Sequence, residues 1–447
     1  MSLFHQSETK TMLNARGRKL LSALDDVMEK QNWSAEQVRE HQWTALQTLV
    51  KHAFENVPMY RRKYLAAGFH PADLRSLDDL ALIPVLTKSE LRQAKTEDAT
   101  SSAHVATARL LASSGSTGVP SAMYRDEDSL WHFTARNTAL YYEWCAHKPL
   151  SEVLYFVDMA HDSIDYALAD LLRTTVTEER MVSITEPPEV QLEKMCEFTP
   201  EFVSSYPSTM RSIAMLMHQR RQTDSHLRLL HLTSEMLDQP TRTLLASVFP
   251  MARIIETYTC TEAGLVAFEC MKDARLHLTE DSGIYEIVDR TGNATLESGE
   301  LVVTDLTNLA TPIIRYRGLG DFCRWETSPC RCGSPLRSIR QLEGRVAQTI
   351  VRRDGTMLSP FVITNAMDEV RGIHQYQIVQ HARGDFEVLV VRDKTGAREA
   401  IQAQIEQSFR DALKDDSACR VEFVPEIKPK PGAHKVPLII SKLDASA

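Results

Sequence analysis

The hydrophobic positions of the chain change period repeatedly from about residue 151 onward. The apolar runs VLYFVD (153–158) and FVSSY (202–206) predict strands. SIDYALADLLRT (163–174) and STMRSIAMLMHQRR (208–221), with apolar residues three and four positions apart, predict helices. Such alternation is typical of a parallel α/β sheet, which binds ligands in the crevice at the carboxyl ends of its strands.

Helical patterns dominate the part of the chain that precedes this sheet. Residues 17–56 have apolar spacing that predicts helical structure, and residues 78–94 have that of two short helices separated at Pro84. Asp126 is a suitable N-cap for a helix that runs to about Cys145.

The part that follows the sheet is rich in strand patterns. Residues 284–316 predict a β meander, and TPIIRYR (311–317) is the last strand expected in it. A closing segment of about 100 residues combines strands with one helix. We therefore predict an α/β protein with two domains. The large N-terminal domain (1–343) has mixed sheets and flanking helices and is helical in about its first 100 residues, and the small C-terminal domain (344–447) is α+β.

Composition places the chain among ordinary globular proteins. Of 447 residues, 43% are hydrophobic and 25% are charged, and the net charge is −9. An acidic protein is a poor partner for nucleic acid or an anionic membrane, so neither is expected. No apolar run approaches the roughly 18 residues of a spanning helix, and the N-terminus lacks the pattern of a signal peptide. We expect a cytoplasmic protein.

Residues 113–120, SSGSTGVP, form a stretch with almost no large side chains. Glycine and serine let the backbone approach a ligand closely, and successive N–H groups in such a turn bind anions. The hydroxyl groups add further donors, so a polyphosphate is a suitable ligand. The stretch is neither a Walker loop nor a GxGxxG motif, and a solvated turn is the alternative interpretation.

Seven motifs of the chain occur in one order. They are HAFENVPMYRRKY (52–64), LRSLDDLALIPVLTKSELR (74–92), SSGSTGVP (113–120), YTCTEAG (258–264), PIIRYRGLGD (312–321), EGRVAQTIVRRDG (343–355) and VEFVPEIKPKPGAHK (421–435). In this order they resemble the adenylate-forming enzymes, and among these the phenylacetate–CoA ligase branch. The resemblance covers residues from about 35 to 442.

The resemblance implies a ligase activity. Enzymes of this kind make an acyl-adenylate from ATP and a carboxylic acid, release pyrophosphate, and pass the acyl group to a thiol, most simply coenzyme A. An aryl or short acyl acid is expected as the substrate, and the family likeness makes a homodimer plausible. Two alternatives stay open, an amine or a carrier-protein thiol as the acceptor, and a degenerate member that only binds nucleotide.

The same resemblance implies which residues bind ATP and Mg²⁺. The loop holds the β- and γ-phosphates, Thr261 faces the α-phosphate, Glu262 binds Mg²⁺ and Asp321 accepts hydrogen bonds from the ribose. The full set expected at the nucleotide is Ser113, Ser114, Gly115, Ser116, Thr117, Gly118, Ser234, Glu235, Tyr258, Thr261, Glu262, Asp321 and Arg345. Val119 stands where the family loop usually has lysine, and Arg125 is a basic residue that could compensate for it.

A catalytic lysine on a mobile C-terminal domain is also implied. Lys435 is the expected residue, and Lys430 and Lys428 are the alternatives. The ammonium group of this lysine neutralises the negative charge that develops as the carboxylate attacks the α-phosphorus. Gln348 occupies the hinge position, where the family often has a charged residue. Tyr206 is expected in the acid pocket, although a strand-end aromatic can equally be a core residue.

The eight cysteines include one close pair, in PCRCG (329–333). We expect a structural zinc site formed by Cys270, His277, Cys330 and Cys332, with Cys323 as a spare ligand. Close relatives resemble zinc proteins in this region. The spacing is shorter than the usual CxxC, so four scattered residues without a metal are the alternative.

Overall fold

Five parallel strands form the part of the sheet that the alternating pattern predicts. They lie in the order β8-β7-β6-β4-β5. Leu154 and Phe156 of β4 pack against one layer of helices, and Val153 and Tyr155 pack against the other. Because both of their faces are buried, the central strands β4 and β7 are nearly continuous apolar runs, which explains why the sequence pattern identifies them. The strands are β4 (Glu152–Val157), β5 (Glu178–Ser183), β6 (Phe202–Ser205), β7 (Leu229–Leu232) and β8 (Arg253–Cys260).

The structure is a computed structural model of the chain. The residues that it describes are 15–112, 122–144, 152–157, 159, 178–184, 186–235, 237, 239–289, 291–296, 298–345, 350–354, 357–358, 363, 366–367, 370–392, 397–414, 416–427, 437 and 439–443. The helix expected over 163–174 lies outside these residues.

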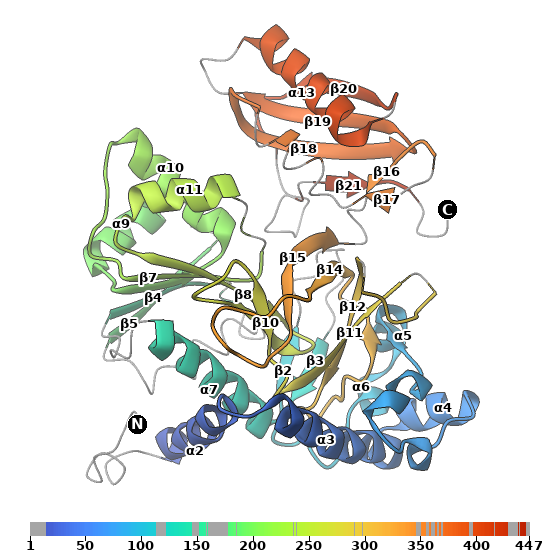
Figure 1. Cartoon of the computed structure of the whole chain (residues 1–447). Helices are drawn as coiled ribbons and strands as arrows, with labels where there is room; N and C mark the ends of the chain where they lie inside the picture. The colour runs from blue at the N-terminus through green and yellow to red at the C-terminus, as the bar shows by residue number, and fades with distance from the viewer. Residues whose placement is uncertain are drawn as a thin grey trace.

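Helices cover both faces of the parallel strands (Figure 1). One face carries α9 (Pro188–Phe198), α10 (Pro207–Gln219) and α11 (Gln239–Val248), and the other carries α7 (Glu127–Trp144) and α2 (Ala15–Lys30). Asp126 is the predicted cap of α7, since its Oδ1 accepts a 2.8 Å hydrogen bond from the backbone N–H of Ser129.

The same sheet continues beyond β8 as an antiparallel arrangement. Its full order is β1-β13-β12-β14-β15-β10-β9-β8-β7-β6-β4-β5, with β11 paired to β12. The mixed α/β architecture that we predicted is therefore confirmed. The added strands are β1 (Leu86–Thr87), β9 (Gly264–Glu269), β10 (Leu276–Leu278), β11 (Gly283–Val288), β12 (Gly299–Asp305), β13 (Tyr316–Arg317), β14 (Asp321–Glu326) and β15 (Ser338–Arg345). A separate hairpin consists of β2 (Arg109–Ala112) and β3 (Ala122–Arg125).

The N-terminal helices pack against the sheet, and they form one hydrophobic core with residues that include those of β9 to β13. They are α3 (Ala35–Asn56), α4 (Pro58–Ala66), α5 (Lys88–Gln93) and α6 (Thr96–Ala99), with the 3-10 turns η1 (Pro71–Asp73) and η2 (Leu77–Leu82). The helical pattern over 17–56 is confirmed, and it consists of the two helices α2 and α3, because Ser34 caps a new helix through a capping box with Gln37.

The last strand expected in the meander is also shorter than predicted. Only Tyr316 and Arg317 of the segment 311–317 are in a strand. Arg315 has a φ of +43°, which ends the extended conformation. Its buried guanidinium pairs with Glu286 at 2.8 Å, so this arginine lies in the interior and not on a strand surface.

The C-terminal segment has a sheet and a core of its own. Four strands lie in the order β20-β19-β18-β21, and α13 (Arg398–Leu413) packs on them (Figure 1). This is the α+β arrangement that the pattern predicts. The strands are β18 (Ile373–Ala382), β19 (Asp385–Arg392), β20 (Ala418–Phe423) and β21 (Ile439–Ser441), and a hairpin of β16 (Ile350–Val351) and β17 (Met357–Leu358) lies beside them.

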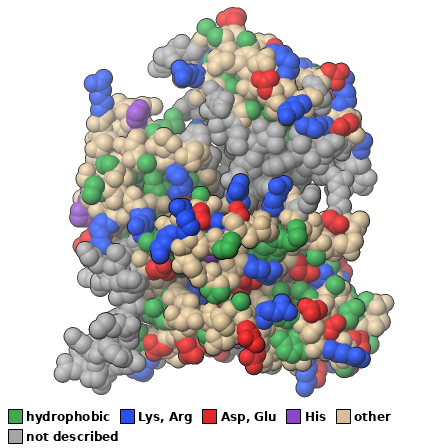
Figure 2. Space-filling view, in the orientation of Figure 1, with side chains coloured by type: hydrophobic (Ala, Val, Ile, Leu, Met, Phe, Trp, Pro, Cys, Tyr) green, Lys and Arg blue, Asp and Glu red, His purple; other side chains and the backbone are tan. Residues whose placement is uncertain are grey.

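Among the described residues, no helix is long and apolar enough to cross a membrane. On the face shown in Figure 2, acidic and basic side chains are interspersed and do not gather into one field of a single sign.

A pair of carboxylates on β8 and β9 makes the stability of the fold dependent on pH. Glu269 accepts hydrogen bonds of 2.9 Å from the backbone N–H of Glu256 and from Arg242. Burial, and then the charge of Glu269, raise the pKa of Glu256 from 4.5 to about 7. The folded state thus retains a proton that the unfolded chain loses, and stability falls as the pH rises from 4.5 to about 7.

We expect Glu256→Gln to stabilise the protein at pH 8 by about 1 kcal/mol, because the amide needs no proton. The gain should vanish near pH 4, where Glu256 is protonated in both states. Urea unfolding at the two pH values measures it, with Glu193→Gln on the exposed side of α9 as the control. An equal gain at both pH values would contradict the titration.

Candidate functional site

The motif TEAG forms the turn between β8 and β9. Gly264 opens β9 at a φ of +68°, and a Cβ there would lie 3.4 Å from the ring of Phe133. Thr261 and Glu262 precede it and are buried, with exposed fractions of 8% and 7%. The hydroxyl of Tyr316 donates a 3.3 Å hydrogen bond to Oε1 of Glu262. The turn therefore presents a threonine and a carboxylate in fixed positions at the carboxyl end of β8.

Arg125 anchors this turn to the neighbouring hairpin. It is the last residue of β3, and its guanidinium donates to the backbone oxygens of Thr261 (3.4 Å) and Glu262 (3.1 Å). It also forms a 2.6 Å ion pair with Asp305, and both side chains are only 1% exposed. Because these contacts occupy the guanidinium in the interior, the interpretation that Arg125 replaces the missing loop lysine is wrong.

Asp321 lies close to the turn through its contact with β8. The hydroxyl of Tyr258 donates a 2.5 Å hydrogen bond to Oδ2 of Asp321. Asp321 begins β14 and lies opposite Arg345, the last residue of β15, in the antiparallel ladder. The two predicted nucleotide residues Asp321 and Tyr258 are therefore brought together, and the backbone of Arg345 lies beside them.

Ser234 and Glu235 follow β7 at the same edge of the sheet. Ser234 has a φ of +65°, which is uncommon for a residue other than glycine. The carboxylate of Glu235 accepts hydrogen bonds from the backbone N–H (2.9 Å) and the hydroxyl (3.0 Å) of Ser208 in the first turn of α10. The carboxylate of Glu235 thus accepts hydrogen bonds at the start of α10, in addition to any contact that it makes with a ligand.

A small cavity of about 20 Å³ lies between α7 and the carboxyl ends of β4, β6, β7 and β8. Tyr206, the N-cap of α10, lines it together with Phe133 and Tyr155. Thr259 of β8 also lines it, two residues before Thr261. The expected acid-pocket residue is therefore at a cavity, and that cavity is at the strand edge that α/β proteins use for ligands.

Several expected site residues lie outside the described part of the chain. They are Ser113, Ser114, Gly115, Ser116, Thr117, Gly118, Val119, Gln348, Lys428, Lys430, Lys435 and the side chain of Arg345. Ala112 and Ala122, which bound the loop, pair directly as the ends of β2 and β3. Since β3 ends at Arg125, the hairpin that carries the loop is joined to the TEAG turn.

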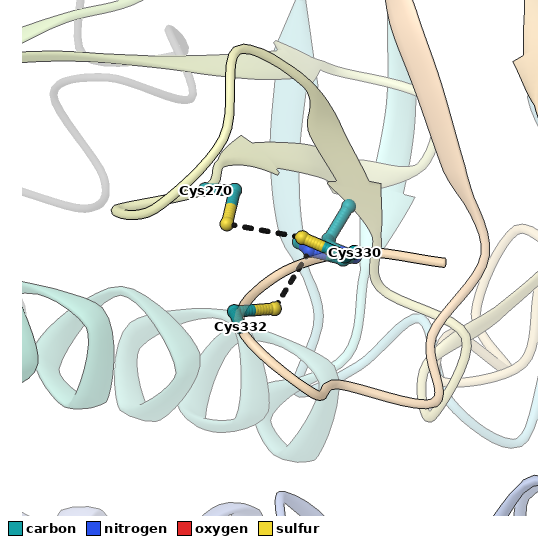
Figure 3. Close-up of side chains that lie close together, drawn as sticks. Cys270, Cys330 and Cys332 are labelled. Carbon is teal, nitrogen blue, oxygen red and sulfur yellow. Dashed lines mark hydrogen bonds between the residues drawn. The ribbon is translucent and has the colours of Figure 1, made fainter. Parts of the chain in front are cut away.

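Four metal-ligand side chains meet at one end of the antiparallel strands. The ligand atoms of Cys270, His277, Cys330 and Cys332 all lie within 4.8 Å of one another. Figure 3 shows the three thiols converging, with Cys270 just after β9 and the other two on the loop between β14 and β15. Cys323 is buried in the core of the sheet and is not part of this group.

The geometry of this group fits a tetrahedral zinc ion. Zinc–sulfur bonds of about 2.3 Å place two sulfur ligands about 3.8 Å apart. The Sγ atoms of Cys270 and Cys330 are 3.4 Å apart, and Sγ of Cys332 is 3.3 Å from Nε2 of His277. Nδ1 of His277 lies 3.2 Å from the carbonyl oxygen of Leu336, so Nδ1 carries the proton and Nε2 is available to a metal. Burial lowers the pKa of His277, which favours the neutral, ligating form.

Sequence reasoning missed two groups that shape the site. The ion-pair role of Asp305 has no sequence signal, because its partner is 180 positions away. His231 is a single histidine in the apolar strand LRLLHLT, which is a recognisable signal for a buried polar contact. Burial lowers the pKa of His231 to about 3, so the ring is neutral.

Several solved structures with the same fold are CoA ligases by name. The structure of 2-hydroxyisobutyryl-CoA ligase in complex with 2-HIB-AMP superimposes with a TM-score of 0.79, at 17% identity, over 93% of this chain and 91% of the other. At this identity the likeness concerns the fold.

Curated relatives cover most of the sequence. The phenylacetate-coenzyme A ligase of Pseudomonas putida is 28% identical over 385 residues, which are 83% of this chain and 84% of the relative. That of Aromatoleum evansii is 30% identical over 299 residues, 64% of this chain and 66% of the relative. The AMP-binding enzyme family matches residues 5–305. This match spans more than half of the chain, which therefore belongs to the AMP-binding enzyme family.

Proposed function

We propose that the protein is an ATP-dependent acid–coenzyme A ligase. The carboxylate oxygen of the acid attacks the α-phosphorus of ATP, pyrophosphate leaves, and the sulfur of coenzyme A then displaces AMP from the acyl carbon. The names of the curated relatives and the family match support this activity. The observation that carries it for this chain is the contact of Tyr258 with Asp321 beside the buried Thr261–Glu262 turn.

Asp321 is the residue that we assign to the ribose of ATP. A carboxylate can accept two hydrogen bonds and so suits a pair of neighbouring hydroxyls. The hydrogen bond from Tyr258 fixes the orientation of this carboxylate and brings an aromatic ring beside the nucleotide. We also assign contacts with the base and the ribose to Ser234, Glu235 and Arg345.

Thr261 and Glu262 are assigned to the phosphate end of the nucleotide, with the loop Ser113–Gly118. A carboxylate is a suitable ligand for Mg²⁺, which prefers oxygen and, when bound, neutralises phosphate charge. The residues fit this role, because Glu262 is held in place by Tyr316 and by the backbone contacts of Arg125. Arg125 is a positioning residue, since its guanidinium points to Asp305 and not to a ligand.

We assign to Lys435 the role of the catalytic cation. It belongs to the C-terminal domain, which we place at residues 344–447, and the large domain precedes it at 1–343. The separate core of the C-terminal sheet supports a unit that can rotate. The acid is assigned to the same strand edge as Thr261, with the far end of its acyl part at the cavity beside Tyr206.

We also propose a structural zinc ion bound by Cys270, His277, Cys330 and Cys332. It would tie the loop between β14 and β15 to β9 and β10. A closed set of three thiolates and one imidazole leaves no open position for a substrate, so the ion contributes stability and takes no part in the reaction.

The first prediction concerns adenylation. With a suitable acid, the protein should exchange labelled pyrophosphate into ATP, and Glu262→Gln and Asp321→Asn should lower the exchange by about 100-fold or more, because each removes a charged contact to the nucleotide. Glu40→Gln, on the exposed face of α3, is the matched control. Wild-type exchange that both variants retain would refute the assignments.

The second prediction separates the three lysines near the C-terminus. Lys435→Gln should lower acid-dependent pyrophosphate exchange by about 100-fold, since it removes the cation that meets the charge of the transition state. Lys430→Gln and Lys428→Gln should stay within about threefold of the wild type. A loss at Lys430 or Lys428 with an active Lys435→Gln would move the assignment to that residue.

The third prediction concerns the metal. Elemental analysis should find about one zinc ion per chain, and Cys332→Ser should lose it and lower the melting temperature, because metal binding is coupled to folding. Cys196→Ser, a free and exposed cysteine, should keep both the metal and the melting temperature. A protein that contains no metal and melts identically with and without a chelator would show that no zinc is bound.

A further inference from the structure

The cavity beside Tyr206 has one hydroxyl group that is not used within the described part of the chain. Thr233 follows β7 and lines the cavity with an exposed fraction of 7%. Its backbone N–H donates to the oxygen of Ser205 at 3.0 Å, which fixes its position. Its Oγ1 is buried, and no described group makes a hydrogen bond with it. A buried hydroxyl without a partner costs roughly 1–3 kcal/mol, so a ligand that pairs with it is stabilised.

His231 and Asn137, two other polar residues of the lining, have hydrogen-bond partners. Nδ1 of His231 lies 2.9 Å from Oγ of Ser204 and 3.3 Å from the hydroxyl of Tyr141, and its Nε2 lies 2.8 Å from Oγ1 of Thr257. The amide of Asn137 donates to the backbone oxygen of Phe133 at 2.9 Å. These contacts hold a polar wall in place, and among the described side chains of the lining Oγ1 of Thr233 is the buried polar atom without a partner.

The described lining of the cavity contains no Asp, Glu, Lys or Arg. Its histidine is neutral, because burial lowers the pKa of His231 to about 3. A charged substituent would therefore be buried without a counter-ion, which is strongly unfavourable. An uncharged donor or acceptor would pair with Oγ1 of Thr233 without that penalty.

The free space also limits the size of the substituent. A cavity needs about 10–15 Å³ to hold a water molecule. The space of about 20 Å³ that the described residues enclose suits one group of that size, such as a hydroxyl.

We propose that the acid substrate carries an uncharged hydroxyl group on its acyl part, and that Thr233 determines this specificity through a hydrogen bond to it. This inference rests on the proposed function, because it identifies the acid class of the same enzyme. The aromatic side chains of Phe133, Tyr155 and Tyr206 in the lining allow the hydroxyl to stand on an aryl acid or on a short chain.

Matched pairs of acids test the proposal by pyrophosphate exchange. The pairs are phenylacetate with 3- and 4-hydroxyphenylacetate, benzoate with 3- and 4-hydroxybenzoate, and isobutyrate with 2- and 3-hydroxyisobutyrate. 4-Carboxyphenylacetate supplies the charged case. We expect kcat/KM for the best hydroxy acid to exceed that of its parent at least tenfold, and the dicarboxylate to be at least 100-fold poorer than the hydroxy acid.

Substitution of Thr233 separates recognition from folding. Thr233→Val keeps the shape and removes the hydroxyl, so it should lower kcat/KM for the hydroxy acid at least tenfold and leave the parent acid within about threefold. Thr233→Ser should retain the preference. Thr100→Val removes a buried hydroxyl that bonds to Thr311, remote from the cavity lining, and should leave the preference unchanged.

The outcomes distinguish the two proposals. If no acid supports exchange, the ligase function itself fails. If parent acids react as well as or better than their hydroxy partners, or if Thr233→Val lowers both alike, the protein is a ligase but the hydroxyl of Thr233 pairs only with water. A Thr233→Val protein that does not fold leaves the preference of the wild type and of Thr233→Ser as the deciding measurement.

Discussion

The buried ion pair between Arg125 and Asp305 fixes the relative position of three regions that are distant in sequence, namely β3 with the start of α7, the end of β12, and the turn at Thr261 and Glu262. Arg125 ends the hairpin that carries the small-residue loop, and Asp305 ends β12. The same guanidinium reaches Ser129 in α7 at 2.6 Å and the backbone of the turn at Thr261 and Glu262. Two charges that are 1% exposed are tolerated only because each has partners with good geometry, and removal of one would leave the other unpaired in the interior. The turn that we assign to the phosphates is therefore held in position by an interaction between two protein side chains.

Polar groups at the cavity beside this turn are buried without charge, in contrast to the ion pair of Arg125 and Asp305. His231 is placed among the hydroxyls of Ser204, Thr257 and Tyr141, which serve both ring nitrogens without a charge. A neutral network of this kind is stable in the interior only when its members are satisfied. The charged groups Glu262 and Asp321 lie past the end of β8 and on β14. The charged side chains thus lie where we place the phosphates and the ribose. The residues that we assign to the acyl part of the substrate are uncharged.

The sequence predicted the elements that local pattern determines. The strands β4 and β7 are nearly continuous apolar runs because both of their faces are buried, and Asp126 was identifiable as a cap from its own chemistry. Local pattern failed at Ser34, where a cap divides a helical pattern, and at Arg315, where a tertiary ion pair holds a left-handed residue in an apparent strand. The unpaired state of the Thr233 hydroxyl within the described part of the chain could not be predicted, because it depends on which groups of distant segments lie next to it.

The strand β8 explains how one element can serve both halves of the proposed reaction. Successive side chains of a strand point to opposite faces. Thr257 contacts His231, and Thr259 lines the acid cavity, while Tyr258 between them points to Asp321 on the other face. The register with β9 shifts between Tyr258 and Thr259, which marks a bulge just before the turn that carries Thr261 and Glu262. A slip of one residue in β8 would exchange the two faces, so the buried apolar neighbours that fix its register also keep the residues that we assign to the acid and to the nucleotide on opposite sides.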